Sequence, residues 1–120
     1  MNKILNLTTK YWLSCSLFIL TAITVLSLSP LETLPPAPGT DKTHHFIAYG
    51  TLILPIALRK PKHWILIALL FIIWSGAIEL IQPYVNRYGE WKDLLANIAG
   101  LACGLIIAEI IKRFFTFDYN

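Results

Sequence analysis

The chain is 120 residues long, with 56% hydrophobic residues, 14% charged residues and a mean hydropathy of +0.61. Soluble domains average about 45–50% apolar and about 25% charged residues, so this composition points away from a soluble domain and toward a membrane protein. The net charge of +3 is small, and nothing in the sequence indicates nucleic-acid binding. The length is typical of one small domain, covering residues 1–120. Cys15 and Cys103 lie within apolar segments, which favours small hydrophobic residues over a disulfide or a metal site.

Four long apolar segments are expected to form transmembrane helices, at residues 11–28, 41–58, 64–81 and 94–111. An 18-residue helix rises by roughly 27 Å, close to the hydrocarbon thickness of about 30 Å. Length favours helices over strands, and the alternation that membrane β-strands require is missing. The predicted fold class is therefore an all-α, integral membrane four-helix bundle. The second helix is the weakest of the four, because its purely apolar part, residues 46–58, is short and contains Pro55.

The first segment has two interpretations, a retained helix or a cleaved signal peptide. Lys3 and Lys10 precede it, as in a signal peptide. Its apolar run is longer than the usual length of about 7–15 residues, however, and Pro30 directly follows a poor cleavage site. A retained helix is the favoured interpretation. The proline-rich residues 30–39 are expected to form a stiff connector outside the membrane.

The placement of lysine and arginine predicts the orientation of the bundle. Seven of these residues lie in the N-terminal segment, the second connection and the C-terminal segment, whereas the first and third connections hold three. Cytoplasmic segments carry an excess of lysine and arginine. Both termini are therefore expected in the cytoplasm, with the first and third connections facing outward.

Polar residues that are energetically unfavourable in a membrane are expected to gather on this outward face. They lie at the start of the second helix, at the end of the third helix, in the third connection and at the start of the fourth helix. Ionisable residues in membrane segments commonly mark functional sites. The candidate site comprises Asp41, Lys42, His45, Tyr49, Glu79, Gln82, Arg87, Asp93 and Asn97.

Helical spacing places several of these residues on shared faces. Residues three or four positions apart are neighbours on a helix surface. Asp93, Asn97, Gly100 and Gly104 therefore form one stripe, and its glycine end is a GxxxG pattern that lets a second helix approach closely. Glu79 lies about one turn inside an apolar segment, where a carboxylate must be paired, protonated or in contact with water.

The same residues also have simpler interpretations. Asp41 and Asp93 each lie where a carboxylate stabilises a helix N-terminus. Lys42 and Arg87 could contact lipid head groups, and Glu79 with Arg87 could form an ion pair that closes the bundle. A polar cluster that only holds four helices together therefore remains an alternative to a functional site.

Two stretches of the sequence, "DKTHHFIAYG" and "ELIQPYVNRYGEWKDLLANIAG", resemble the VanZ-like family of small membrane proteins. That family pairs an Asp-Lys-x-x-His-Phe-x-x-Tyr opening with a later Glu-x-x-Gln, an Arg and an Asp-x-x-x-Asn-x-x-Gly. The resemblance covers about 60 of the 120 residues, and it selects His45 rather than His44. The matching positions are Asp41, Lys42, His45, Phe46, Tyr49, Glu79, Gln82, Arg87, Asp93, Asn97 and Gly100.

The resemblance implies a multi-pass protein of the bacterial cytoplasmic membrane, with its polar site on the extracytoplasmic side. The family is named for lowered susceptibility to teicoplanin, a lipoglycopeptide that acts at the outer face of that membrane. The favoured hypothesis is a site for an anionic lipid, a lipid-linked cell-wall precursor or the lipoglycopeptide. Lys42 and Arg87 would hold the anionic group, while Glu79, Gln82 and Asn97 provide hydrogen bonds. Membrane lipids are the expected partners, and association of several copies of the chain is compatible with this hypothesis.

The alternative is a membrane-embedded enzyme that modifies a lipid head group by acid–base chemistry. Asp41 could orient His45, and Glu79 would be a second titrating group. The sequence identifies no nucleophile in a diagnostic context. His45, Glu79 and Asp93 could chelate a divalent ion, but three residues from separate segments do not predict a metal site by themselves. No cofactor and no metal are predicted.

Overall fold

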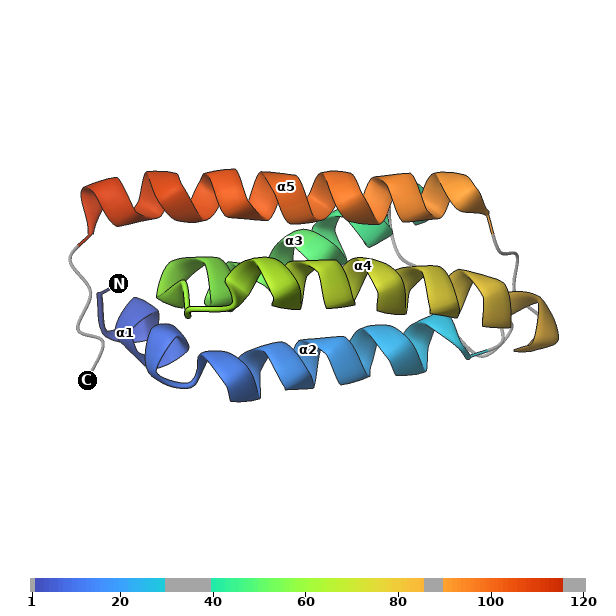
Figure 1. Cartoon of the computed structure of the whole chain (residues 1–120), viewed down its shortest axis with the longest axis horizontal. Coiled ribbons are helices and arrows are strands. Elements are labelled where there is room, and N and C mark those ends of the chain that lie inside the picture. Colours follow the sequence, from blue (N-terminus) through green and yellow to red (C-terminus); the bar gives the residue numbers. More distant parts are fainter. Residues whose placement is uncertain (1, 30–39, 86–89, 116–120) are drawn as a thin grey trace.

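The computed structural model describes residues 2–29, 40–85 and 90–115 (Figure 1). Five α-helices follow one another along this part of the chain, and the 3₁₀ helix η2 (Gln82–Val85) extends the fourth. The described residues contain no strand, which confirms the predicted all-α class. The α-helices are α1 (Asn2–Lys10), α2 (Trp12–Ser27), α3 (Asp41–Arg59), α4 (Trp64–Ile81) and α5 (Trp91–Phe114).

The helix bounds agree closely with the predicted segments. α2, α3 and α4 end within one residue of prediction, whereas α5 begins three residues earlier, at Trp91, and continues to Phe114. The N-terminal residues were not predicted to be helical, but they form α1, which meets α2 at an angle of 81° beside Tyr11. The proline-rich connector, residues 30–39, lies outside the described residues.

Two helical stretches of the described chain have the length and hydropathy of a membrane span, Trp64–Val85 and Trp91–Phe114. The bent pair α1–α2 provides a third if both parts belong to one span. The described residues thus contain two or three candidate spans, and not clearly the four that were predicted. α3 has the required length but not the hydropathy, because its first turn is strongly polar and it ends at Arg59.

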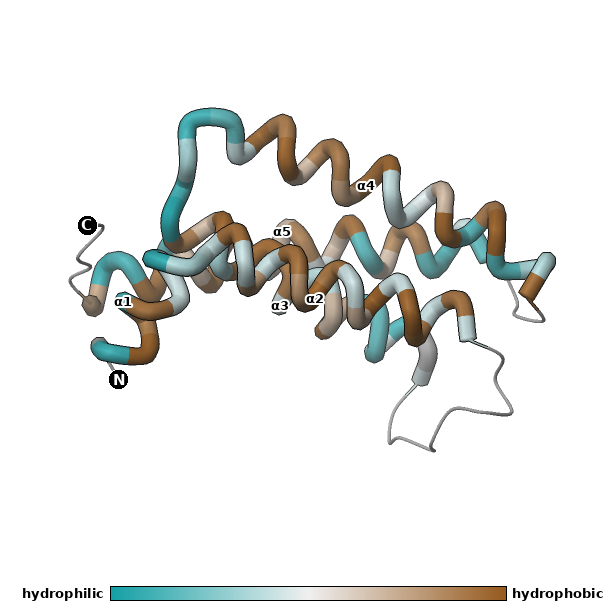
Figure 2. Tube along the Cα trace, turned by 90° about the horizontal axis from the view of Figure 1, so that it is seen from below, coloured by the Kyte–Doolittle hydropathy of each residue, from teal (hydrophilic) through white to brown (hydrophobic). Residues whose placement is uncertain are grey.

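Large apolar side chains cover the outer faces of α2, α4 and α5. Phe18, Leu80 and Phe114 are each 77% exposed, and Ile73 is 66% exposed. Figure 2 shows this most clearly for α4, which is hydrophobic along most of its length and hydrophilic near its ends. Soluble monomers rarely expose contiguous apolar patches larger than a few hundred Å². This exterior is that of a membrane protein, because lipid chains can cover it without a hydrophobic penalty.

α3 forms the centre of the bundle. The second half of α3 is almost completely enclosed, from Leu52 to Leu58, and Tyr49 is 1% exposed. Its polar first turn therefore leads into a segment that is covered by protein rather than by lipid. This position explains how a helix of moderate hydropathy can run through the middle of an apolar bundle.

Glycine residues let α3 and α5 approach at backbone distance. A Cβ atom on Gly100 would collide with the carbonyl oxygen of Phe46, and one on Gly104 would collide with Ile53 and with the Gly50 carbonyl oxygen. α5 makes its most extensive packing contact with α3. The glycine end of the predicted stripe therefore lies at this helix crossing, and α3 is the helix that it contacts.

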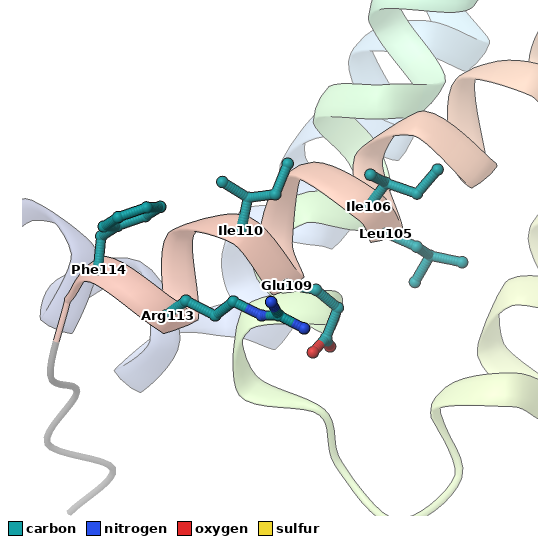
Figure 3. Close-up of a pocket in the computed structure, with 6 residues that line it drawn as sticks. All are labelled: Leu105, Ile106, Glu109, Ile110, Arg113 and Phe114. Atoms are coloured by element: carbon teal, nitrogen blue, oxygen red, sulfur yellow. The ribbon is translucent and has the colours of Figure 1, made fainter.

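The two ends of the bundle differ in character. α1, the connection between α3 and α4, and the end of α5 lie together at one end (Figure 1). There Lys60 ends α3 in a left-handed backbone conformation, and its ammonium lies 3.6 Å from Glu109. An open groove of about 540 Å³ follows the last turns of α5 at this end (Figure 3), lined by Leu105, Ile106, Glu109, Ile110, Arg113 and Phe114.

Candidate functional site

Polar side chains from α3, α4 and α5 meet at the opposite end of the bundle. α3 and α5 begin there and α4 ends there (Figure 1), so the first turns of two helices face the last turns of a third. The seven residues of this group, termed the polar cluster, are Lys42, His45, Ser75, Glu79, Glu90, Asp93 and Asn97.

Lys42 contacts both an exposed carboxylate and a nearly buried one. Its Nζ lies 3.0 Å from Glu90 Oε2 and 3.5 Å from Asp93 Oδ1. The side chains of Lys42 and Glu90 are 46% and 51% exposed, whereas that of Asp93 is 5% exposed. Exposed ion pairs contribute little to stability, so the Lys42–Glu90 pair defines the mouth of the cluster more than it holds the fold together.

A chain of side-chain contacts runs inward from Asp93. His45 Nε2 lies 3.8 Å from Asp93 Oδ2, and His45 Nδ1 lies 3.0 Å from Asn97 Oδ1. The Asn97 amide in turn donates a hydrogen bond to the Ser75 hydroxyl. Asn97 is 1% exposed and Ser75 is fully buried. The imidazole of His45 is thus held between a carboxylate on its outer side and a buried amide on its inner side.

Glu79 and Gln82 connect the end of α4 to its neighbours. Glu79 Oε2 accepts a hydrogen bond of 3.0 Å from the backbone N–H of Glu90, the residue that precedes α5. A carboxylate at this position stabilises the helix by satisfying an unpaired donor and complementing its dipole. Gln82 donates to the Ser27 carbonyl oxygen at 3.1 Å and so ties η2 to the end of α2.

The remaining predicted site residues are placed differently. Tyr49 is buried one turn below His45 and interacts with Ser75, so it lies beneath the cluster rather than at its mouth. Asp41 is the first residue of α3, but its side chain lies outside the described part of the structure, as does all of Arg87. Gly100 and Gly104 contact α3 deeper in the bundle.

Two members of the cluster were not among the predicted site residues. Glu90 lies three residues before Asp93, and this helical spacing could have indicated that both carboxylates face Lys42. Ser75 lies four residues before Glu79 on α4, but a serine in an apolar helix usually bonds to its own backbone, so the sequence carried no signal for its contact with Asn97.

The polar cluster contains more carboxylates than basic side chains. Lys42 contacts the carboxylates of Glu90 and Asp93, whereas the imidazole of His45 lies near the carboxylates of Asp93 and Glu79. Moreover, one atom from each of His45, Glu79 and Asp93 lies within 4.8 Å of the other two. Among the described residues, this is the one group of such side chains with the spacing of metal ligands.

Comparison with known proteins agrees with the resemblance of the sequence motifs. The family model described as VanZ/LLP1 matches residues 2–112, which include every member of the polar cluster. No curated protein and no solved structure matches the chain. Because the family match covers nearly the whole chain and the apolar helices fit a membrane protein, the chain belongs to the VanZ/LLP1 family.

Proposed function

We propose that this protein spans the bacterial cytoplasmic membrane and binds the polar head group of a lipid or lipid-linked molecule in the polar cluster. The main support for this proposal is the position of the cluster. Polar groups from three helices converge where the apolar outer faces of α4 and α5 end, and head groups would lie at this depth if these helices span the bilayer. The partly exposed Lys42 and Glu90 would be the first residues that a head group meets.

In this proposal α2, α3, α4 and α5 all cross the bilayer, with α3 shielded from lipid by its neighbours. Both termini lie in the cytoplasm and the polar cluster lies on the extracytoplasmic side. The excess of lysine and arginine in the N-terminal, C-terminal and α3–α4 segments supports this orientation. The common location of α1, the α3–α4 connection and the end of α5 at one end of the bundle is compatible with it (Figure 1).

Cysteine labelling tests this topology. In a background where Cys15 and Cys103 are replaced by alanine, Glu90→Cys should react with a membrane-impermeant maleimide added to intact spheroplasts. Lys62→Cys, in the α3–α4 connection, should react only after the membrane is permeabilised; both positions are exposed in the structure. The reverse pattern would place the cluster in the cytoplasm, and labelling of both positions from outside would refute the four-span topology.

The cluster offers a cation and several hydrogen-bond acceptors to a head group that carries a phosphate together with hydrogen-bond donors. Lys42 is the cation that can pair with phosphate, and the surrounding carboxylates of Glu90 and Asp93 can accept hydrogen bonds from hydroxyl or amino groups. Anionic phospholipids, lipid-linked cell-wall precursors and lipoglycopeptides all carry anionic groups and donors beside an apolar anchor. Binding of such molecules would provide a route by which the protein alters envelope lipids or teicoplanin susceptibility.

Native mass spectrometry of the gently extracted protein can measure this binding. Phosphatidylglycerol, a polyprenyl-pyrophosphate-linked precursor and teicoplanin would be added separately, with phosphatidylcholine for comparison. Lys42→Ala is expected to lower occupancy by the preferred ligand about fivefold, because one cation near the membrane surface contributes at this scale. Lys62→Ala, which removes an exposed lysine from the other end, should leave occupancy unchanged. Equal effects of the two substitutions would contradict a site in the cluster.

Binding is favoured over catalysis because the buried hydroxyl groups are poorly placed for nucleophilic attack. Ser75 is fully buried and accepts a hydrogen bond from Asn97, and Tyr49 is 1% exposed. A nucleophile needs a base within hydrogen-bond reach and access to its substrate. Among the described residues, the His45 nitrogens face Asn97 and Asp93, and neither faces a hydroxyl group.

A further inference from the structure

We propose that His45, Glu79 and Asp93 bind a divalent transition-metal ion of the Zn²⁺ type. The three residues come from three different helices, α3, α4 and α5, and each brings one ligand-type atom within 4.8 Å of the others. Tetrahedral Zn²⁺ holds nitrogen and oxygen ligands at about 2.0–2.2 Å, which separates the ligand atoms by roughly 3.4 Å. The ligand atoms would have to move closer together by small changes of the side-chain torsion angles to reach that spacing. This inference goes beyond head-group binding and does not depend on it.

The hydrogen bonding of His45 leaves a metal-binding nitrogen directed at Asp93. Because the Asn97 amide nitrogen donates to Ser75, its oxygen Oδ1 faces His45 and can only accept. The His45 Nδ1 therefore carries the hydrogen, and in the neutral imidazole Nε2 presents a lone pair. This Nε2 lies 3.8 Å from Asp93 Oδ2, which is also an acceptor. Two acceptors that face each other at this distance are stabilised by a cation between them.

The contact between His45 and Asn97 is also the kind of contact that orients histidine ligands in metal sites. Ligating histidines usually donate their second N–H to an oxygen, which holds the ring in place and selects the tautomer. Asn97 is itself held by Ser75, so the orientation of the ring is anchored in the buried centre of the bundle. Glu79 is oriented in a comparable way, through the backbone N–H of Glu90.

Asp93 supplies an independent indication of a bound cation. It is 4% exposed, and its Oδ1 atom has no hydrogen-bond partner among the described residues. The ammonium of Lys42 lies 3.5 Å from Asp93 Oδ1 and His45 Nε2 lies 3.8 Å from Asp93 Oδ2, both beyond the usual hydrogen-bond length. A nearly buried carboxylate is costly unless it is paired and hydrogen-bonded, or bound to a metal. A metal ion in contact with Asp93 would compensate that cost directly.

The ligand set selects the class of metal. Imidazole nitrogen favours zinc and related transition metals, whereas calcium and magnesium take sets of six or more oxygen ligands. One histidine and two carboxylates would also neutralise the charge of a divalent ion, consistent with the excess of carboxylates in the cluster. Three protein ligands leave a further coordination position for water or for a ligand from outside the chain.

The test is metal binding by the purified protein in detergent, after removal of any affinity tag and treatment with a chelator. When Zn²⁺ is added back and the excess is removed, wild-type protein should take up about one Zn²⁺ per chain by elemental analysis, and Co²⁺ should give the visible absorption bands of a low-coordinate site. Asp93→Asn and Glu79→Gln keep the side-chain size and should each weaken Zn²⁺ binding at least tenfold in a titration, as should His45→Ala. His44→Ala, which alters an exposed neighbouring histidine, should bind Zn²⁺ like the wild type.

Several outcomes would overturn the inference. Unchanged Zn²⁺ affinity in both Asp93→Asn and Glu79→Gln would show that these carboxylates are not ligands. Loss of binding in His44→Ala but not in His45→Ala would assign the metal to the surface. A preference for Ca²⁺ or Mg²⁺ over Zn²⁺ would refute the proposed class of ion. Circular dichroism of each variant verifies folding, and a Zn²⁺-dependent rise in the melting temperature of the wild type alone provides a readout that does not require the variants.

Discussion

Replacing Gly100 with alanine is expected to destabilise the protein by about 1–3 kcal/mol. The added Cβ atom would collide with the carbonyl oxygen of Phe46, which belongs to the backbone of α3 and cannot rotate away. α3 and α5 would have to separate along their most extensive contact. Thermal unfolding in detergent, followed by the fluorescence of the four tryptophan residues, would measure the loss.

Gly76 provides a matched control for this substitution. It lies within α4, and a Cβ atom built on it meets no neighbouring side chain or helix within 4 Å. Gly76→Ala should therefore leave the melting temperature unchanged or raise it slightly, because alanine is the better helix former. Gly104→Ala should resemble Gly100→Ala, since its Cβ atom would meet both Ile53 and Gly50. Equal melting temperatures for Gly76→Ala and Gly100→Ala would contradict the close approach of α3 and α5.

Most of the helical architecture could be predicted from the sequence, because the polar residues between the long apolar segments mark the helix bounds clearly. The prediction was less accurate where tertiary structure decides the outcome. The sharp turn beside Tyr11 depends on how α1 packs against the other helices, and no proline or glycine marks it. The role of α3 was also hard to predict, because hydropathy cannot distinguish a helix that faces lipid from one that is covered by protein.

The location of the candidate site was easier to predict than its contacts. The i, i+4 spacing of Asp93 and Asn97 placed both residues on one face of a helix, and the structure shows both beside His45. Spacing within one helix could not reveal which residues of a neighbouring helix they contact. Ser75 could therefore be assigned to the cluster only from the structure, since its partner Asn97 lies on another helix.

Asn97→Ala is expected to be the most damaging substitution within the cluster, with a loss of about 2 kcal/mol or more in the free energy of unfolding. Asn97 is 1% exposed and connects His45 to Ser75, so its removal takes the hydrogen-bond partner from His45 Nδ1 and leaves the buried Ser75 hydroxyl with its Tyr49 contact alone. A buried polar group that loses its partner typically costs about 1–3 kcal/mol. Thermal unfolding in detergent would measure the change, and Thr51→Ala, at an exposed position of α3, should have little effect.

A double-mutant cycle separates the Ser75 contact from the other effects of this substitution. Ser75→Ala removes the hydroxyl that accepts from Asn97, so the double variant should lose less stability than the sum of the single variants. Asn97→Ala should in addition weaken Zn²⁺ binding about 10–100-fold, because the orientation of a histidine ligand depends on its second hydrogen bond. A stability loss with unchanged metal affinity would mean that Asn97 supports the fold but does not position His45. The two measurements together therefore distinguish a polar cluster that only holds helices together from one that is arranged to bind a ligand.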